Sequence, residues 1–241
     1  MERHRNWNRH LTKRRNLYYP GLCGRLARLV ITSENLTPWG IISSSHQVIA
    51  AACIRSEAGG VSAPCFHIMS LLPIVYYPDP VLLKVGDPVK PDEFNDDLSA
   101  TIERMFETMY DARGVGLAAP QVGISRRFFV MDVADPEGKP QPRAFINPEI
   151  VTIEGEQVGE EGCLSFPGLY QVVKREMRVI VRAQDVFGEA FELDLQDLAA
   201  RCVLHETDHC DGIVFLDRMT PLKRELARRN IKRLQQTGEW V

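Results

Sequence analysis

His205-Glu206-Thr207-Asp208-His209 forms an H-E-x-x-H string near the C-terminal end of this 241-residue chain. On a helix, two histidines four residues apart lie on one face and can bind the same metal ion. The glutamate between them can move protons to and from a water molecule beside that ion. The string therefore predicts a helix that carries a catalytic metal site, and a metal-dependent hydrolase is the leading hypothesis.

The neighbouring sequence supports a helix at this place. Residues Gln196 to Cys210 have helical spacing, with Leu198 and Cys202 on the expected inward side. Gly212 follows them as a stop signal. The string is therefore expected in the last turns of this helix.

Two further helices are predicted, one on each side of this one. The first has apolar residues on one face as far as Met109, and Asn95 before it can cap its N-terminus. The second begins at Thr220, with proline in its first turn, and runs to about Gln236. Its other faces are basic, and along it four residues recur four apart: Leu222, Leu226, Asn230 and Leu234.

Short β-rich runs lie between these helices and are separated by turn signals that contain Pro, Gly or Asn. They occupy residues 127–133, 144–146, 177–183 and 190–195. Runs this short, joined by tight turns, suggest small antiparallel sheets. The predicted fold class is α+β, with small antiparallel β-sheets packed around the central H-E-x-x-H helix and a further helix at the C-terminus.

The first 68 residues differ from the rest of the chain in charge. They contain nine Lys or Arg against three Glu, a balance of +6, so residues 69–241 must carry −9 to give the net charge of −3. They also lack sustained periodicity, and we expect a basic, disordered extension there. The preferred interpretation is a misassigned start, with translation beginning at Met69. An organellar transit peptide and a nucleic-acid-binding arm are the alternatives.

The composition argues against a membrane protein and against a secreted one. The longest N-terminal apolar run, Val48 to Ile54, is far shorter than the ~20 residues that a membrane-spanning helix needs. Six irregularly spaced cysteines, in a chain large enough to fold without disulfides, favour a reducing compartment. We expect a cytoplasmic protein without a membrane partner, or an organellar one if residues 1–68 are a transit peptide.

A catalytic metal site needs a third protein ligand, and no histidine follows His209. Proteases with this string usually take that ligand from downstream, so the protease interpretation is weakened. The best upstream donor is Cys163, in the E-G-C-L-S segment at 161–165, where glycine permits a close backbone approach. For Cys163 alone, an inert buried thiol is the alternative.

A third segment, G-V-G-L-A-A-P-Q at 114–121, follows a predicted helix and lacks the later glycine and lysine of nucleotide-binding loops. Taken with E-G-C-L-S at 161–165 and H-E-T-D-H at 205–209, in this order and approximate spacing, it closely resembles the three signature motifs of the peptide deformylases. The resemblance covers residues 69–241, whose C-terminal helix looks like that of the bacterial type I class. Residues 1–68 match nothing in the family.

The resemblance implies a catalytic domain over residues 69–241 that removes the formyl group from the N-terminal formylmethionine of new polypeptides and releases formate. Cys163, His205 and His209 would hold one divalent ion and leave a fourth position for water. Iron(II) is implied as the native ion, with zinc, nickel or cobalt as substitutes. Glu206 would accept a proton from that water as general base.

The resemblance also implies how the substrate would be held. The side-chain amide of Gln121 and the backbone N–H of Leu164 would stabilise charge on the formyl oxygen. Cys202 would line the pocket for the methionine side chain, although an ordinary core cysteine is equally consistent with its position. The peptide would lie as an extra strand against the backbone of three residues: Val115, Gly116 and Gly162.

Residues around the predicted ligands raise further expectations. Asp208 can accept a hydrogen bond from Arg175 or from a backbone N–H, and Glu161 can brace the loop of the thiolate ligand, with surface solvation as the alternative for both. Two positions depart from the family pattern: Leu204 stands where glutamine is common, and Cys210 where leucine is usual. The departures remove no predicted ligand or base. An enzyme of reduced activity is the alternative interpretation of these two substitutions.

The basic C-terminal helix has two interpretations, a solvated surface or attraction to RNA such as that of the ribosome.

Two functional classes other than a deformylase are kept as alternatives. One is an H-E-x-x-H peptidase, which would cleave peptides internally. The other is a ribosome-associated binding protein in which the metal site is degenerate.

Overall fold

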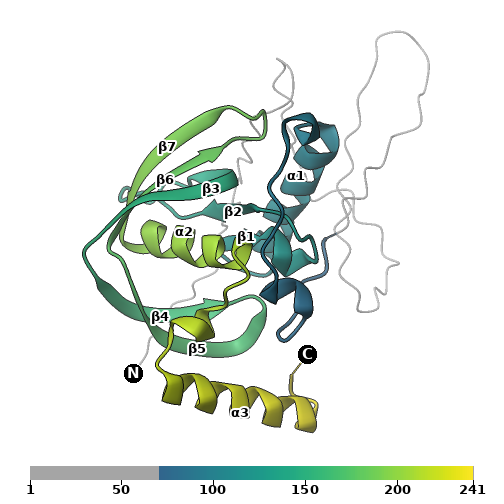
Figure 1. The fold of residues 1–241 in the computed structure, drawn as a ribbon, viewed down its shortest axis with the longest axis vertical. Helices are drawn as coiled ribbons and strands as arrows, with labels where there is room; N and C mark the ends of the chain where they lie inside the picture. Colours follow the sequence, from purple (N-terminus) through teal and green to yellow (C-terminus); the bar gives the residue numbers. More distant parts are fainter. Residues whose placement is uncertain (1–70, 241) are drawn as a thin grey trace, which may run out of the picture. The chain divides into compact units, whose positions relative to one another are not determined.

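The computed structural model describes residues 71–240, so the predicted extension at 1–68 lies outside the described residues. Within that range the α-helices, labelled in Figure 1, are α1 (Asp96–Asp111), α2 (Asp197–Cys210) and α3 (Pro221–Thr237). The strands are β1 (Gly116–Ala118), β2 (Phe128–Asp132), β3 (Pro142–Glu154), β4 (Gln157–Cys163), β5 (Phe166–Arg175), β6 (Arg178–Gln184) and β7 (Ala190–Gln196).

The strands form two separate antiparallel sheets. The larger has the order β1-β2-β3-β6-β7, and the smaller consists of β4 and β5. In Figure 1, α2 lies between the larger sheet and the β4–β5 pair, and α3 lies beyond that pair. The predicted α+β class, with small antiparallel sheets around the H-E-x-x-H helix, is confirmed.

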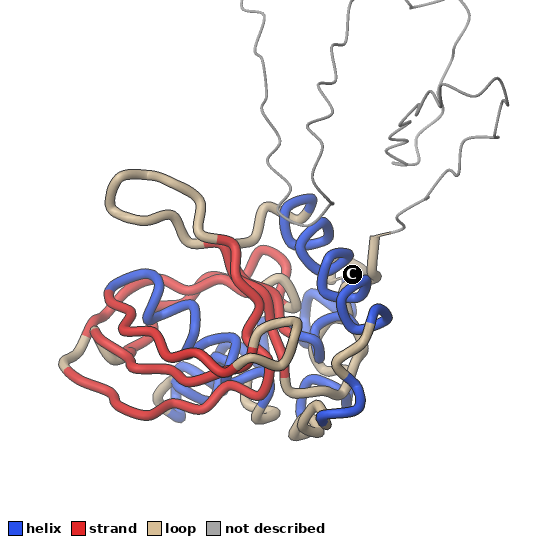
Figure 2. The backbone as a smooth tube through the Cα atoms, turned by 90° about the horizontal axis from the view of Figure 1, so that it is seen from above, coloured by secondary structure: helices blue, strands red, loops and turns tan. Residues whose placement is uncertain are grey.

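Strand β2 shows why the larger sheet has helices on both faces. Successive side chains of a strand point to opposite faces. Phe128 and Val130 belong to the core that contains residues of α1, whereas Phe129 and Met131 belong to the core that contains residues of α2. Figure 2 shows helices on both sides of the red strands. A strand covered on both faces reads as a continuous apolar run, which is why its sequence predicts it well.

Helix α2 is buried from Ala200 to Cys210, apart from the half-buried Leu204. Ala200, Val203 and Cys210 pack against the larger sheet. The prediction that Leu198 faces inward is wrong, because its side chain is 54% exposed. This residue lies in the first turn of α2 and lines a cavity beside the helix. Cys202, predicted on the same side, is buried.

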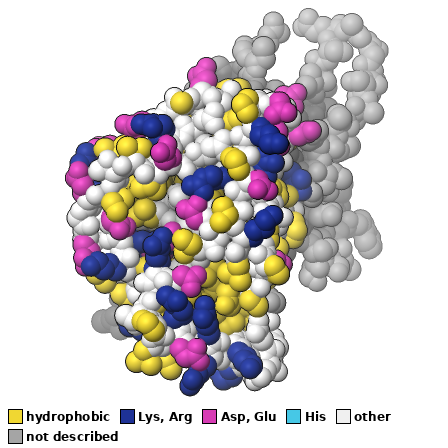
Figure 3. Space-filling model, viewed as in Figure 1, with side chains coloured by type: hydrophobic (Ala, Val, Ile, Leu, Met, Phe, Trp, Pro, Cys, Tyr) yellow, Lys and Arg dark blue, Asp and Glu magenta, His cyan; other side chains and the backbone are white. Residues whose placement is uncertain are grey.

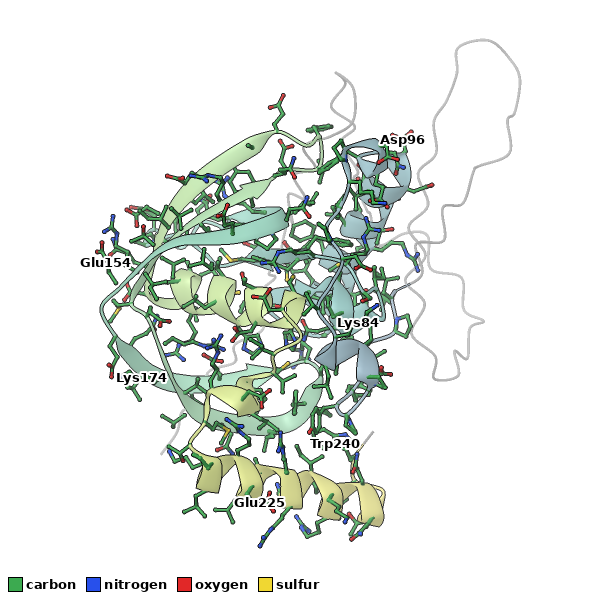
Figure 4. The ribbon with its side chains drawn as sticks, in the orientation of Figure 1. Lys84, Asp96, Glu154, Lys174, Glu225 and Trp240 are labelled. Atoms are coloured by element: carbon green, nitrogen blue, oxygen red, sulfur yellow. The ribbon has the colours of Figure 1, made fainter. Side chains whose placement is uncertain are left out.

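Helix α3 is anchored by fewer residues than its four-residue spacing suggests. Ala227 and Ile231 are buried, but Leu222 and Leu226 are 72% and 56% exposed. Trp240, labelled in Figure 4, follows the helix and donates its indole N–H to the carbonyl of Tyr77 at 2.9 Å. The apolar contact of α3 is therefore made by Ala227 and Ile231, with the half-buried Leu234 packed beside them.

Candidate metal centre and active site

Three side chains from two distant segments converge at the end of β4 and on α2. The ligand atoms of Cys163, His205 and His209 all lie within 4.8 Å of one another, and Cys163 Sγ is 3.2 Å from His209 Nε2. His205 uses Nδ1 to contact Glu161, which leaves Nε2 for the cluster. One thiolate and two imidazoles at this separation fit a single divalent ion.

Glu161 holds one of these histidines in place. Its carboxylate is 3.0 Å from His205 Nδ1 and accepts two hydrogen bonds from Arg175, at 2.8 and 3.0 Å, and one from Arg201 at 2.7 Å. Burial would raise the pKa of Glu161, but the hydrogen bonds from His205 and Arg175 outweigh it and hold that pKa well below its ordinary value. A charged carboxylate behind a histidine ligand fixes its tautomer and orientation.

Asp208 extends this network on the far side of Arg175. Arg175 donates from Nη1 to Asp208 Oδ2 at 2.5 Å, as the sequence predicted, and Arg218 donates from Nε to the same oxygen at 2.9 Å. The side chains of Arg175 and Asp208 are 3% and 7% exposed. The buried guanidinium therefore joins the helix of the two histidines to the strand pair of the cysteine.

Glu206 lies beside the cluster without a strong partner of its own. It is 4% exposed, and its Oε2 has no hydrogen-bond partner within residues 71–240. Burial is the main reason that its pKa is raised to about 7. A buried carboxyl group with a pKa near neutrality suits proton transfer.

Gly116 leaves the space that Glu206 occupies. A Cβ at residue 116 would lie 2.8 Å from Cys202 Sγ and would collide with Glu206 Oε1. We therefore expect Gly116→Ala to displace the carboxylate and lower kcat by at least about tenfold, the factor that ~1.4 kcal/mol represents. Steady-state kinetics test this, and a variant with unchanged kcat would contradict the assigned place of Glu206.

Gln121 is oriented by a backbone group. It belongs to the turn Ala119–Val122, is 1% exposed, and accepts a hydrogen bond from Ala118 N through Oε1 at 2.8 Å. That bond turns the amide nitrogen toward the cluster, where Nε2 lies 3.4 Å from Cys163 Sγ. Leu164, the other predicted oxyanion residue, follows Cys163 directly and lines the cavity in front of the cluster.

A cavity of about 620 Å³ opens in front of the cluster. The four predicted substrate-binding residues all line it: Val115, Gly116, Gly162 and Cys202. Strand β1 is the terminal strand of the larger sheet, and β4 belongs to a two-stranded sheet. Both can therefore offer a strand edge to an extended peptide. The carbonyl of Val115 already accepts from Asp132 N at 2.9 Å and lies 3.6 Å from the Cys202 thiol.

Sequence reasoning missed three residues that also line this cavity: Tyr170, Leu198 and Arg201. Arg201 and Leu198 stand four and seven residues before His205 on α2. Residues at this spacing share one face of a helix, so the spacing was the signal that could have found them. Tyr170 packs its ring over Gly162, and the sequence alone carries no sign of that contact.

The two departures from the family pattern lie away from the cavity. Cys210 is completely buried in the core, where its thiol lies 3.7 Å from the carbonyl of Phe128 and burial raises the pKa of the thiol strongly. Leu204 packs beside the same core and lines a separate cavity of about 260 Å³ on another face of α2. Neither lines the cavity in front of the cluster, and Cys163, Cys202 and Cys210 are all free thiols.

An α+β fold with a Cys-His-His cluster, a buried glutamate beside it and an open cavity defines a hydrolase of the H-E-x-x-H class. The family model of polypeptide deformylases matches residues 71–225. The chain belongs to the peptide deformylase family, whose members are hydrolases that act on N-formyl peptides.

Similar proteins agree with this assignment. The peptide deformylase of Acidobacterium capsulatum is 49% identical over 172 residues, which cover 71% of this chain and all of that protein. The crystal structure of a Legionella pneumophila peptide deformylase has a TM-score of 0.62 and 47% identity, and the match covers 69% of this chain and 98% of that one. An Acinetobacter baumannii deformylase, described as bound to Met-Ala-Ser, has a TM-score of 0.59 and 34% identity over 63% of this chain and 99% of that one.

Proposed function

We propose that this chain removes the formyl group from the N-terminal formylmethionine of newly made polypeptides and releases formate. The observation that carries the proposal is the buried carboxylate of Glu206 beside the convergent Cys163, His205 and His209. Family membership supports the reaction class. The Acinetobacter structure, with Met-Ala-Ser bound, supports a peptide that begins with methionine.

One divalent ion per chain fits the cluster, and we propose iron(II) as the native ion, with zinc, nickel or cobalt as substitutes. Such an ion would lower the pKa of a water molecule and polarise the formyl carbonyl. The two imidazoles are held on one face of α2, and Glu161 behind His205 fixes which nitrogen faces the ion. The chain thereby supplies a donor set before the ion binds.

Glu206 is the proposed general base. Its buried carboxylate would take a proton from the attacking water and pass it to the nitrogen of the leaving peptide amine. Gln121 would donate from its amide to the formyl oxygen as negative charge develops there, together with the backbone N–H of Leu164. The ordering of Gln121 by Ala118 N means that little reorganisation is needed in this step.

The backbone of three residues would bind the main chain of the peptide: Val115, Gly116 and Gly162. Because these contacts involve only backbone groups, they would accept many sequences after the first residue. Cys202, whose thiol lies beside Gly116, would contact the methionine side chain. This arrangement suits an enzyme that must act on nearly every new polypeptide.

Replacing Gln121 tests the oxyanion role. Gln121→Glu keeps an oxygen that can accept from Ala118 N but removes the amide donor, so kcat should fall by about 10²- to 10³-fold. Bound metal should be measured in the same samples, because the new charge lies near the cluster. A fall of less than threefold with full metal content would remove Gln121 from the proposed mechanism.

The products distinguish this function from that of an internal peptidase. Anaerobically purified protein with added iron(II) should convert formyl-Met-Ala-Ser to formate and intact Met-Ala-Ser, as followed by mass spectrometry. Internal cleavage of longer unformylated peptides, without formate release, would instead support the peptidase alternative. Metal-loaded protein that produces neither would support a binding protein.

Helix α3 is the proposed contact with the ribosome. Five of its basic residues are exposed, and Figure 3 shows Lys and Arg side chains among hydrophobic ones at this end of the described residues. The exposed basic residues are Lys223, Arg228, Arg229, Lys232 and Arg233. Such a surface would attract ribosomal RNA in a salt-dependent manner.

We propose a cytoplasmic location, where new polypeptides carry formyl groups in bacteria. The relatives named above are bacterial. Among the described residues, no helix has the length and apolar character needed to cross a membrane. An organellar location remains the alternative if residues 1–68 are a transit peptide.

A further inference from the structure

A short segment before α1 joins the two sides of the proposed oxyanion site. In this segment, Val75 donates its backbone N–H to the carbonyl of Gln121 at 2.9 Å. Two residues later, Tyr77 donates its backbone N–H to the carbonyl of Ser165 at 3.0 Å. Gln121 carries one proposed oxyanion donor, and Ser165 directly follows Leu164, which carries the other. The two donors come from separate parts of the chain, and this segment is hydrogen-bonded to both parts.

Trp240, which follows α3, binds the same segment (Figure 4). Its indole N–H donates to the carbonyl of Tyr77 at 2.9 Å, and the residue is 8% exposed. An indole has one polar hydrogen and no acceptor, so this bond satisfies the only polar group of the side chain. Both backbone groups of Tyr77 are therefore bonded, the N–H to Ser165 and the carbonyl to Trp240.

Aromatic packing holds the side chain of Tyr77 as well. Its ring stacks on that of Phe166 with the ring centroids 4.9 Å apart, and the ring of Trp240 meets Phe166 edge-on at 6.2 Å. Phe166 is 1% exposed and lies three residues after Cys163, which packs beside the same apolar cluster. Trp240 is therefore coupled both to Tyr77 and to the loop that contains the predicted thiolate ligand.

An oxyanion donor is effective only at close range. It must lie about 2.7–3.1 Å from the atom on which the charge develops. A site whose supporting contacts are about 1 Å too loose loses function even when every residue is present. Gln121 and Leu164 lie on separate segments, so their separation depends on the contacts that join those segments. The hydrogen bonds of Val75 and Tyr77 are such contacts.

We propose that Trp240 is a positioning residue that acts through Tyr77 and keeps the amide of Gln121 and the N–H of Leu164 at the separation that the reaction needs. This inference rests on the proposed deformylase function. The alternative is that Trp240 only fastens the end of α3 to the rest of the domain. That alternative predicts a loss of stability without a change in the chemical step.

The test measures kcat and KM of Trp240→Phe for formyl-Met-Ala-Ser in the metal-loaded full chain. Phenylalanine keeps an aromatic ring beside Phe166 and removes the N–H donor. The value of kcat should fall by about tenfold, which is part of the 10²- to 10³-fold that a whole oxyanion donor contributes. KM should change by less than about twofold, because these donors act mainly in the transition state. A wild-type kcat at full metal content would overturn the proposal.

A double-mutant cycle with Gln121→Glu separates positioning from a purely structural role. In that background the amide donor is already absent, so Trp240→Phe can displace only the N–H of Leu164. It should therefore lower kcat by less than about threefold there. An equal tenfold loss in both backgrounds would show that Trp240 does not act through Gln121, and the proposal would be wrong.

Ile231→Val is the matched control on α3. Ile231 is 2% exposed and belongs to the same apolar cluster as Trp240, so the variant loosens the packing of the helix and keeps the bond to Tyr77. It should lower the urea midpoint of unfolding and leave kcat as in the wild type. If it lowered kcat as much as Trp240→Phe does, the effect would come from loosening α3, and the proposal would fail.

A chain that ends at Glu239 is a second variant, which removes the indole entirely and keeps α3 complete to Thr237. It should show the same fall in kcat and the same dependence on Gln121. A wild-type kcat in this shortened chain would overturn the role of Trp240. A wild type that releases no formate would instead refute the deformylase function itself.

Discussion

Glu206→Gln is expected to lower kcat by at least about 10³-fold while the protein keeps its metal ion. The amide is nearly the same size as the carboxylate but cannot accept the proton of the attacking water, and general-base catalysis typically contributes 10²- to 10⁴-fold. Glu206 provides none of the three clustered ligand atoms, so one ion per chain should remain. Steady-state formate release and metal analysis on the same preparation measure both effects.

Glu149→Gln is the control for this variant. It makes the same substitution on a side chain of β3 that is 69% exposed, and it should leave both kcat and metal content unchanged. If Glu206→Gln kept wild-type turnover, its proposed role as base would be wrong. If it lost the ion instead, the loss of activity would say nothing about proton transfer, and Glu206 would have to be assigned to the ligand set.

Arg175→Met is expected to lower the free energy of unfolding by about 3 to 5 kcal/mol. The arginine lies between two buried carboxylates, those of Glu161 and Asp208, and its side chain is 3% exposed. Removing it leaves two acids in the interior without their shared cation. Denaturation in urea, followed by circular dichroism, gives the difference from the wild type.

Arg182→Met is the matched control, because this arginine also contacts two carboxylates but is 52% exposed. Its partners are Glu149 and Glu192 on neighbouring strands of the larger sheet. An exposed pair contributes about 0 to 1 kcal/mol, so the control should unfold close to the wild type. Equal stabilities for the two variants would mean that the buried network does not hold α2 to the β4–β5 pair.

The sequence predicts best those elements whose pattern is set locally. Helix α2 was expected at Gln196 to Cys210 and is observed at Asp197–Cys210, because its spacing and the glycine after it both signal where it ends. Strands β6 and β7 were also expected near their observed positions. By contrast, β3 was expected over 144–146 and spans Pro142–Glu154.

Strands β1, β4 and β5 were not predicted. Most of β4 consists of glycine and glutamate, residues that are depleted in strands. Its pairing with β5 leaves apolar side chains such as Val158 and Val172 exposed, so the usual alternation between buried apolar and exposed polar residues is lost. Residues of these three strands line the cavity. A single sequence does not show which residues line a cavity, so it does not predict these strands.

In the site, too, some residues were predicted from the sequence and others were not. The family resemblance brought together the three cluster residues, Glu206 and Gln121. In the structure the three ligand atoms lie within 4.8 Å of one another, and Gln121 Nε2 lies 3.4 Å from Cys163 Sγ. Arg201 was missed, because an arginine on a helix normally reads as a solvated residue. Its burial depends on Glu161, which is 40 residues away and is supplied by another strand. Long-range charge pairing of this kind has no local signature.

The central claim is that one ion held by Cys163, His205 and His209 makes this chain a deformylase. Titration of the metal-free protein with iron(II) under anaerobic conditions, with formate release from formyl-Met-Ala-Ser as the readout, tests it most directly. Formate release should rise in proportion to added iron and reach a plateau at one ion per chain. Formate release that does not depend on the ion, or no release at one bound ion per chain, would contradict the account.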